Sequence, residues 1–295
     1  MVCEVDKDDP LGRSRMGGMH VHLRLKFTDG VSWLARVPRQ NFTSFGAHLT
    51  GEILLSECAF LKWLESVQIP APRLHKYALG DDNDVGVPYM LVDELPSTPF
   101  ERYSASEEQT KKVYLQIAEI QSVIYKHPFD RVGSLTLDSQ ETMCLGPIAG
   151  DKAGFLSQLG PFSNAKGFFV KYAEEHLRQI ADGQLWGQFP TDAYLMFKYL
   201  KELALEGKCN LVDDAADEGP FYLKHADDKG DHILVDDEFN VTGIIDWSFA
   251  RPLPAYDAFG PSLLTAELDQ LLRGGRGCLL WMSCSQAPLM RNALS

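Results

Sequence analysis

The residues best suited to chemistry lie in the segment from Phe221 to Trp247, which reads FYLKHADDKGDHILVDDEFNVTGIIDW. His225 and Asp227 follow a run of strand-like residues, and Asp246 ends a second run that is wholly apolar. A carboxylate at the end of an apolar strand is costly to desolvate unless it has a partner. Aspartates in such positions could orient a hydroxyl group or hold a divalent cation. We therefore treat this segment as the first candidate for an active site.

The segment resembles the catalytic loop and metal-binding strand of the aminoglycoside phosphotransferase family, in which a His-Gly-Asp loop with a later Asn precedes a hairpin ending in Ile-Asp-Trp. The resemblance implies a protein-kinase-like fold that transfers the γ-phosphate of ATP with the help of Mg²⁺. Catalysis of this reaction depends mainly on positioning and on neutralising charge. By this resemblance Asp227 would meet the acceptor hydroxyl, Asp246 would hold Mg²⁺, and His225 would brace the catalytic loop.

Two positions of the loop are unusual. His232 stands where the family has Asn, and imidazole is a poor ligand for a hard ion that prefers oxygen. Three outcomes are open: Asp231 or Asp228 supplies the missing oxygen, the site favours a softer ion such as Mn²⁺, or metal binding is impaired. Lys229 occupies the place of a lysine that approaches the transferring phosphate in many protein kinases, and a solvated lysine is the alternative.

Two upstream features agree with the resemblance. The segment 33–38 looks like the family's third strand, in which Arg36 would contact the nucleotide phosphates and Glu57 on the next helix would be its ion-pair partner. The pair Gly17-Gly18 precedes the first strand of a hairpin, where a phosphate-covering turn belongs. The alternatives are that Arg36 lies on the surface of the strand, that Glu57 faces solvent, and that Gly17-Gly18 is an ordinary turn.

The elements that must position these residues follow from the periodicity of the apolar residues. Alternation at 20–27 and 31–37 around Thr28-Asp29-Gly30 predicts a β-hairpin. Helical spacing predicts helices at 53–67, 106–125, 165–180 and 193–205, and strand patterns return at 87–95, 221–224, 233–235 and 241–245. Residues 1–11 carry too many charges to predict a first strand. We expect an α+β protein with a two-lobed protein-kinase-like fold.

The order of these elements predicts two domains. Residues 1–95 are expected to form a small β-rich N-lobe, a nucleotide-binding sheet with one helix. The stretch from Pro96 to Pro99 suits a hinge. Residues 96–295 are expected to form a larger, mostly helical C-lobe that contains the catalytic β-hairpin, with the acceptor site along 145–187 and the C-terminal segment.

Composition limits the partners. The 28 Lys and Arg against 41 Asp and Glu, a net charge of −13, argue against nucleic-acid binding and favour a cationic or neutral small-molecule acceptor. The six cysteines form no CxxC pair, which indicates free thiols in a reducing compartment. No apolar run approaches the roughly 20 residues of a membrane-spanning helix. A soluble, cytoplasmic protein without a membrane partner is expected.

The main hypothesis is thus an ATP-dependent, Mg²⁺-dependent small-molecule kinase. One alternative is a pseudokinase that keeps the fold as a nucleotide-binding or scaffolding module, because His232 replaces a metal ligand. A protein kinase is a further alternative, but residues 247–259 lack an Ala-Pro-Glu motif. Since members of the family act on antibiotics, choline-like amines, sugars and amino acids, the resemblance does not identify the acceptor.

Overall fold

A computed structural model of the chain describes residues 3–6, 17–39, 46–151, 158–208, 217–228, 230–260, 262 and 264. Its contacts divide the chain into two compact units, each built from several segments. The first unit contains residues 1–117, 135–144 and 231–248, and the second contains residues 118–134, 145–230 and 249–295. The sequence-based division at residue 95 stays a prediction.

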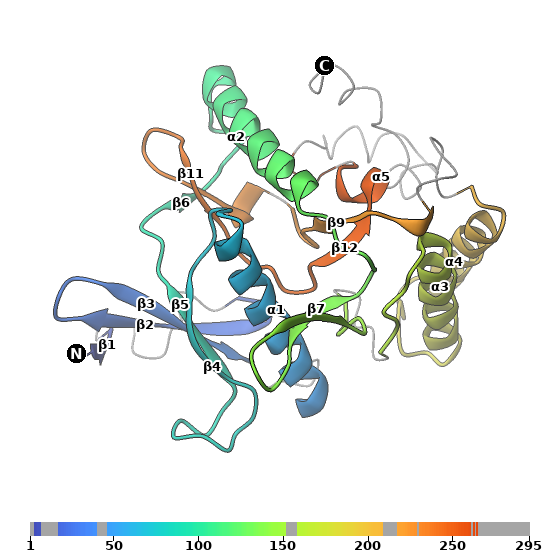
Figure 1. The fold of residues 1–295 in the computed structure, drawn as a ribbon, viewed down its shortest axis with the longest axis horizontal. Helices are drawn as coiled ribbons and strands as arrows, with labels where there is room; N and C mark the ends of the chain where they lie inside the picture. The colour runs from blue at the N-terminus through green and yellow to red at the C-terminus, as the bar shows by residue number, and fades with distance from the viewer. Residues whose placement is uncertain are drawn as a thin grey trace. The chain divides into compact units, whose positions relative to one another are not determined.

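The first unit contains an antiparallel five-stranded sheet (Figure 1). Its strands are β1 (Cys3–Val5), β2 (His20–Phe27), β3 (Ser32–Pro38), β4 (Leu74–Ala78) and β5 (Tyr89–Asp93), in the spatial order β1-β2-β3-β5-β4. The predicted hairpin is confirmed as β2 and β3. In its turn Gly30 has a φ of +90°, a conformation that glycine adopts without strain, and the Asp29 carboxylate accepts the Val31 N–H.

Strand β1 corrects the expectation that the charged N-terminal segment forms no strand. It pairs with β2, and Asp6 follows it. The buried Asp6 carboxylate accepts hydrogen bonds from Lys26 at 3.1 Å and Arg24 at 3.4 Å. The acidic charge is therefore neutralised by basic residues of the neighbouring strand, a compensation that the local sequence does not show.

Helix α1 (Ala47–Ser66) lies against strands β4 and β5. The helix begins earlier than the predicted range of 53–67 and buries Leu54, Phe60 and Leu64. It ends at Ser66, Val67 is its C-cap, and Gln68 then adopts a positive φ of 60°. Helix α1 also carries one buried charged residue, Glu57, whose burial requires a partner.

A second sheet of the first unit carries the predicted catalytic hairpin. Its strands are β6 (Thr98–Pro99), β10 (Ile233–Val235) and β11 (Val241–Ile244), in the order β11-β10-β6. In the hairpin turn the Asp236 carboxylate accepts hydrogen bonds from the backbone and side chain of Asn240. Strand β6 lies within the predicted hinge stretch 96–99. Asp246 lies two residues beyond the end of β11.

Helix α2 (Glu107–Lys126) matches its predicted range closely and runs from the first unit into the second. Ser106 and Gln109 cap its start reciprocally, each side chain accepting the other residue's N–H. Gln116 of this helix accepts the Val241 N–H at the start of β11. Two further strands, β7 (Ser134–Leu137) and β8 (Met143–Gly146), pair with each other and were not predicted.

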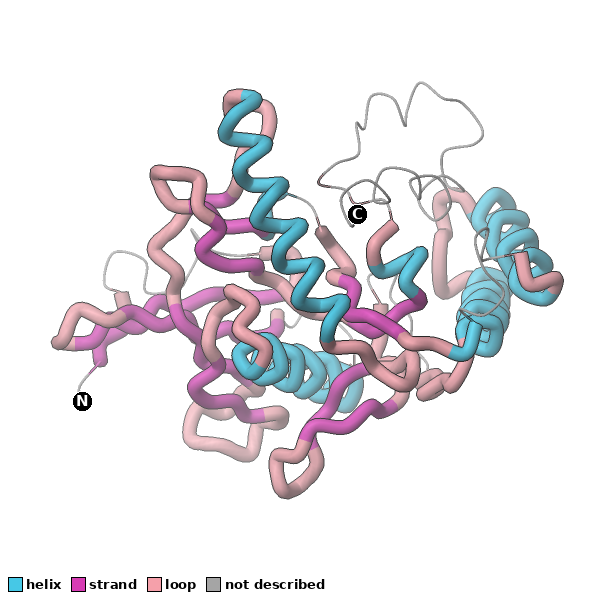
Figure 2. Tube along the Cα trace, turned by 45° about the horizontal axis from the view of Figure 1, so that its top comes forward, coloured by secondary structure: helices cyan, strands magenta, loops and turns pink. Residues whose placement is uncertain are grey.

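Helices make up most of the regular secondary structure described in the second unit. This unit contains α3 (Ala165–Ala181), α4 (Pro190–Leu205) and the short α5 (Ala255–Ala258), together with the strand pair β9 (Phe221–Lys224) and β12 (Arg251–Pro254). Helices α3 and α4 lie side by side (Figure 2), and Ile180 of α3 and Phe197 of α4 belong to one buried apolar cluster. Strand β12 was not predicted because two of its four residues are prolines. A two-stranded sheet tolerates prolines because both of its strands are edge strands. Among the described residues, no helix has both the length and the apolar character needed to cross a membrane.

Candidate active site

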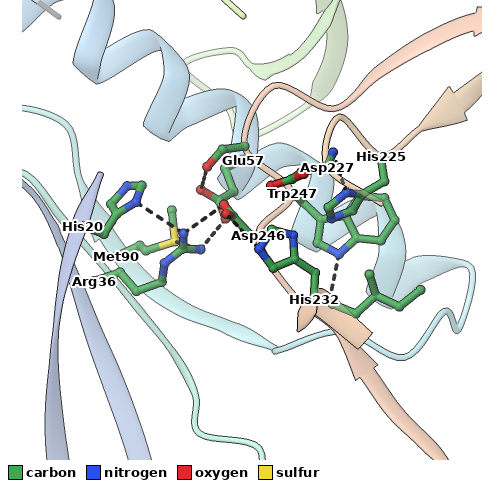
Figure 3. Close-up of polar contacts among 11 residues, drawn as sticks. His20, Arg36, Glu57, Met90, His225, Asp227, His232, Asp246 and Trp247 are labelled. Carbon is green, nitrogen blue, oxygen red and sulfur yellow. Dashed lines mark hydrogen bonds and ion pairs between the residues drawn. The ribbon is translucent and has the colours of Figure 1, made fainter. Parts of the chain in front are cut away.

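Arg36 is the central residue of the site in the first unit (Figure 3). It lies on β3, opposite His22 of β2 and Met90 of β5. Its guanidinium donates a hydrogen bond through Nη1 to Glu57 Oε1, and both side chains are buried. Burial by itself lowers the pKa of Arg36, but the carboxylates of Glu57 and Asp246 raise it above its ordinary value. The predicted ion pair between strand and helix is confirmed.

Ser248 completes the surroundings of Glu57. Its hydroxyl donates to Glu57 Oε2 at 2.7 Å, so the two oxygens of one carboxylate have different partners. Sequence reasoning did not predict this contact. The available signal was the position of Ser248 directly after the Asp246-Trp247 pair.

Asp246 lies in a tight turn after β11. Its φ of +61° is unusual for a residue with a side chain, and Trp247 stabilises the turn by donating from Nε1 to the Ile244 carbonyl at 2.8 Å. The Asp246 carboxylate is 37% exposed, and its Oδ1 lies 3.5 Å from Arg36 Nη2. The turn therefore presents a partly exposed carboxylate beside a buried cation.

His232, the departure from the family pattern, also lies beside Asp246. Its Nε2 is 3.6 Å from Asp246 Oδ2, and its carbonyl accepts the Ile245 N–H. The described residues contain no group of three or more His, Cys, Asp or Glu side chains arranged to hold a metal ion. Mg²⁺ typically uses one or two carboxylates together with substrate phosphates and water. Asp246 fits that role, whereas His232 adds a nitrogen and no oxygen.

His20 is a further neighbour of Arg36 that sequence reasoning treated only as a strand residue. Its Nδ1 lies 3.5 Å from Arg36 Nη2, and Met90 Sδ lies 3.9 Å from Nη1. Burial, and next the positive charge of Arg36, lower the pKa of His20 to about 3. His20 is therefore a neutral acceptor beside the guanidinium at physiological pH.

The predicted catalytic loop begins where β9 ends, in the second unit. The Asp227 N–H donates to His225 Nδ1 at 3.0 Å, and both side chains are buried. The contact lies within the loop that His225 is predicted to brace. Asp228 accepts from Lys224 Nζ at 3.0 Å, while Lys229 lies outside the described residues. The catalytic roles of the loop residues remain predictions.

The glycine pair forms a turn before β2. The Gly17 N–H donates to the His20 carbonyl at 2.9 Å, and Arg39 donates to the Gly17 carbonyl at 3.0 Å. Gly17 and Gly18 are both exposed. A phosphate-covering role for this turn stays a prediction.

Comparison with protein families finds one match over more than half of the chain. The model of the phosphotransferase enzyme family (APH) matches residues 47–260, which include helix α1, the candidate loop and the Asp246 turn. Among curated proteins, the chain is similar to a subtelomeric hrmA-associated cluster protein found in two strains of Aspergillus fumigatus. The two are 28% identical over 122 residues, which is 40% of this chain and 23% of the relative.

Solved structures show the same architecture at low sequence identity. A Ralstonia eutropha protein assigned to the aminoglycoside phosphotransferases has a TM-score of 0.52 at 13% identity, over 91% of this chain and 68% of that protein. The Plasmodium vivax ethanolamine kinase has a TM-score of 0.50 at 12% identity, over 97% of this chain and 64% of the kinase.

A third structure is the aminoglycoside phosphotransferase APH(4)-Ia in complex with AMP-PNP and hygromycin B. It has a TM-score of 0.50 at 15% identity, over 87% of this chain and 69% of that protein. Matches at this level show the fold alone. The predicted α+β, protein-kinase-like fold is confirmed.

Proposed function

The chain belongs to the phosphotransferase enzyme family, and from this premise we propose that it transfers the γ-phosphate of ATP to a hydroxyl group of a small molecule. The observation that carries the proposal is the convergence of Arg36, Glu57 and Asp246 from three separate segments of the sequence. A strand cation, its helix partner and an aspartate after a hairpin are the parts that a kinase uses to hold nucleotide phosphates and a metal ion.

Each residue has a proposed role. Arg36 would contact the nucleotide phosphates, and Glu57 would fix the direction of its guanidinium. Asp246 would hold Mg²⁺, or Mn²⁺ if His232 shifts the preference. When bound, the ion would neutralise charge on the phosphates. The Gly17-Gly18 turn would cover the phosphates, and Lys229 would approach the one being transferred.

Asp227 would act on the acceptor. Its carboxylate would accept a hydrogen bond from the acceptor hydroxyl and receive the proton as the oxygen attacks the γ-phosphorus. The bond between that phosphorus and the β–γ bridging oxygen breaks, so ADP leaves. His225 would keep the loop in place through its bond to the Asp227 N–H.

Nucleotide and acceptor are assigned by class. The complex of APH(4)-Ia with AMP-PNP and hygromycin B supports ATP as donor and a hydroxyl-bearing small molecule as acceptor. The structural similarity to the ethanolamine kinase is also consistent with an acceptor that contains an amine. The net charge of −13 favours a cationic acceptor over an anionic one.

Two substitutions test the assignment of roles. Asp227→Asn should abolish measurable phosphate transfer while nucleotide affinity stays close to wild type, because the acceptor side alone is affected. Asp246→Ala should lose both turnover and the metal-dependent part of ATP binding. Measuring turnover, and thermal stabilisation by nucleotide with and without Mg²⁺, distinguishes the role of Asp227 from that of Asp246. A turnover near wild type in Asp227→Asn, or unchanged metal-dependent binding in Asp246→Ala, would contradict the corresponding role.

One observation favours a second candidate, a nucleotide-binding pseudokinase. His232 approaches Asp246 where the family supplies an oxygen ligand. An ATP-consumption screen over aminoglycosides, choline-like amines, sugars, amino acids and nucleosides distinguishes the two functions. Turnover with one class supports the enzyme, whereas ATP binding without turnover in any class supports the pseudokinase.

A further inference from the structure

We propose that Ser248 is a positioning residue, which holds the Glu57 carboxylate in the orientation that directs Arg36 and connects it to the turn carrying Asp246. The inference rests on the proposed nucleotide-binding role of Arg36 and Asp246. It assigns to that function a residue that would act through Glu57 and Arg36.

The first argument is the way in which the Glu57 carboxylate is shared. Oε1 accepts from Arg36, and Oε2 accepts from the Ser248 hydroxyl at 2.7 Å. Glu57 is 1% exposed and Ser248 is 4% exposed, so water does not readily replace either partner. A hydrogen bond to a buried charged group is among the stronger ones in a protein. The hydroxyl therefore restrains rotation of the carboxylate plane about its ion pair.

The second argument is the rigidity of the turn that carries Ser248. The buried Trp247 ring is fixed by its hydrogen bond to the Ile244 carbonyl, and Asp246 adopts a positive φ on the other side of it. These contacts hold the backbone on which Ser248 lies. Through one hydrogen bond, helix α1 and the Asp246 turn depend on each other's position.

The third argument is the competition for Arg36. Its Nη2 already lies 3.5 Å from Asp246 Oδ1 while Nη1 binds Glu57. If the Glu57 carboxylate rotates, Asp246 becomes the alternative acceptor for the guanidinium. The cation would then leave the direction needed for the phosphates, and the aspartate proposed to hold the metal would be occupied.

Ser248→Ala tests the inference through the separation of KM from kcat. Arg36 would contact the phosphates in both the ground state and the transition state, so loss of its orientation should mainly weaken binding. We expect KM for ATP to rise about tenfold, the size of one hydrogen bond to a charged group. The change in kcat should be smaller, and stabilisation by ATP with Mg²⁺ should fall.

Two further variants separate positioning from simple packing. Ser248→Cys fills the site with a slightly larger sulfur atom but replaces the hydroxyl with a weak donor, so it should behave like Ser248→Ala. Ser134→Ala is the matched control, because Ser134 is also buried and its hydroxyl oxygen accepts the Ala149 N–H at 2.9 Å. It should lower the melting temperature without raising KM for ATP.

The outcomes distinguish this inference from the function on which it rests. If wild type shows metal-dependent stabilisation by ATP and Ser248→Ala has the same KM and stabilisation, the positioning role is wrong and the proposed function stands. The same holds if Ser248→Cys retains wild-type KM, because the strong hydroxyl donor is then not required. If wild type shows no stabilisation by ATP under any metal condition, both proposals fall together.

Discussion

Two carboxylates and one imidazole surround the guanidinium group of Arg36, and their electrostatic effects oppose one another. Glu57 and Asp246 raise the pKa of Arg36, which keeps the group charged despite its burial. The same positive charge, after burial itself, lowers the pKa of His20. The site therefore holds one permanent cation and one permanently neutral base at physiological pH.

The pKa of His20 leads to a prediction on acid stability. Its folded-state pKa of about 3 lies below the ordinary value of 6.5, so the unfolded chain binds more protons between these pH values. Stability should therefore fall as the pH decreases from about 6.5 towards 3. His20→Gln, which cannot titrate, should make the denaturation midpoint depend less on pH in this window. The same substitution at His48, exposed on helix α1, is the control. An unchanged pH dependence in His20→Gln would contradict the prediction.

His232 gives a prediction on the metal ion. If His232 has replaced an oxygen ligand without compensation, His232→Asn should raise activity or ATP affinity with Mg²⁺, because an amide oxygen suits a hard ion. If imidazole binds a softer ion, wild type should prefer Mn²⁺ and the variant should lose that preference. A titration of both metals with both proteins separates these cases. Lower activity with both metals alike would show that His232 has a different role.

A further case is that Asp231 or Asp228 supplies the oxygen ligand that His232 does not. If either supplies the missing oxygen, His232→Asn should change little and substitution of that aspartate should be damaging. Activity of Asp228→Asn and Asp231→Asn with each metal identifies which of the two supplies it.

At the scale of elements, pairing between distant segments decides where the site residues lie. Strand β3 is paired with both β2 and β5, which fixes Arg36 in the interior of the sheet. Helix α1 packs against β4 and β5 and brings Glu57 to Arg36 on β3. The hairpin of β10 and β11 positions Asp246 through the Ile244 N–H, which donates to the Pro70 carbonyl at 2.9 Å. Three separate contacts between segments thus bring together Arg36 and its two carboxylate partners.

The segment between α2 and β7 carries a prediction on stability. Gly133 is buried, and a Cβ at this position would clash with the Gly146 carbonyl oxygen and lie 3.2 Å from Pro161 Cβ. A backbone carbonyl cannot move aside as easily as a side chain. Gly133→Ala should therefore destabilise the protein by about 1–3 kcal/mol in chemical denaturation.

Gly80→Ala is the control for this substitution. Its Cβ would meet no atom within 4 Å, and the change should stay within about 0.5 kcal/mol of wild type. Equal stability of the Gly133 and Gly80 variants would show that the backbone near Gly146 relaxes without cost.

At the scale of the whole molecule, the acidic net charge should affect which acceptors bind. The net charge of −13 creates a negative potential that attracts cations and repels anions, and salt screens it over about 10 Å at 0.1 M. A cationic acceptor should therefore bind less well as salt increases. Its KM should rise several-fold between low salt and about 0.5 M. KM for a neutral hydroxyl acceptor should change little over the same range. Equal salt dependence for both acceptors would show that the net charge does not steer the substrate.

The sequence by itself predicted the elements whose signals are local. The β2–β3 hairpin, the four long helices and the strands around the catalytic segment follow from alternation, helical spacing and turn residues. The family resemblance added the pairing of Arg36 with Glu57, which the structure confirms. These predictions succeeded because neighbouring residues, or a motif of known spacing, contain the information.

The tertiary structure alone decided the contacts that depend on pairing and burial. Strands β1, β4 and β12 carry charges, polar residues or prolines, and they become strands because a distant partner satisfies their backbone or neutralises their charge. The neutral state of His20 and the hydrogen bond from Ser248 to Glu57 arise only when separate segments meet in an interior from which water is largely excluded. Desolvation strengthens these interactions, and the fold, not the local sequence, determines which groups lose water.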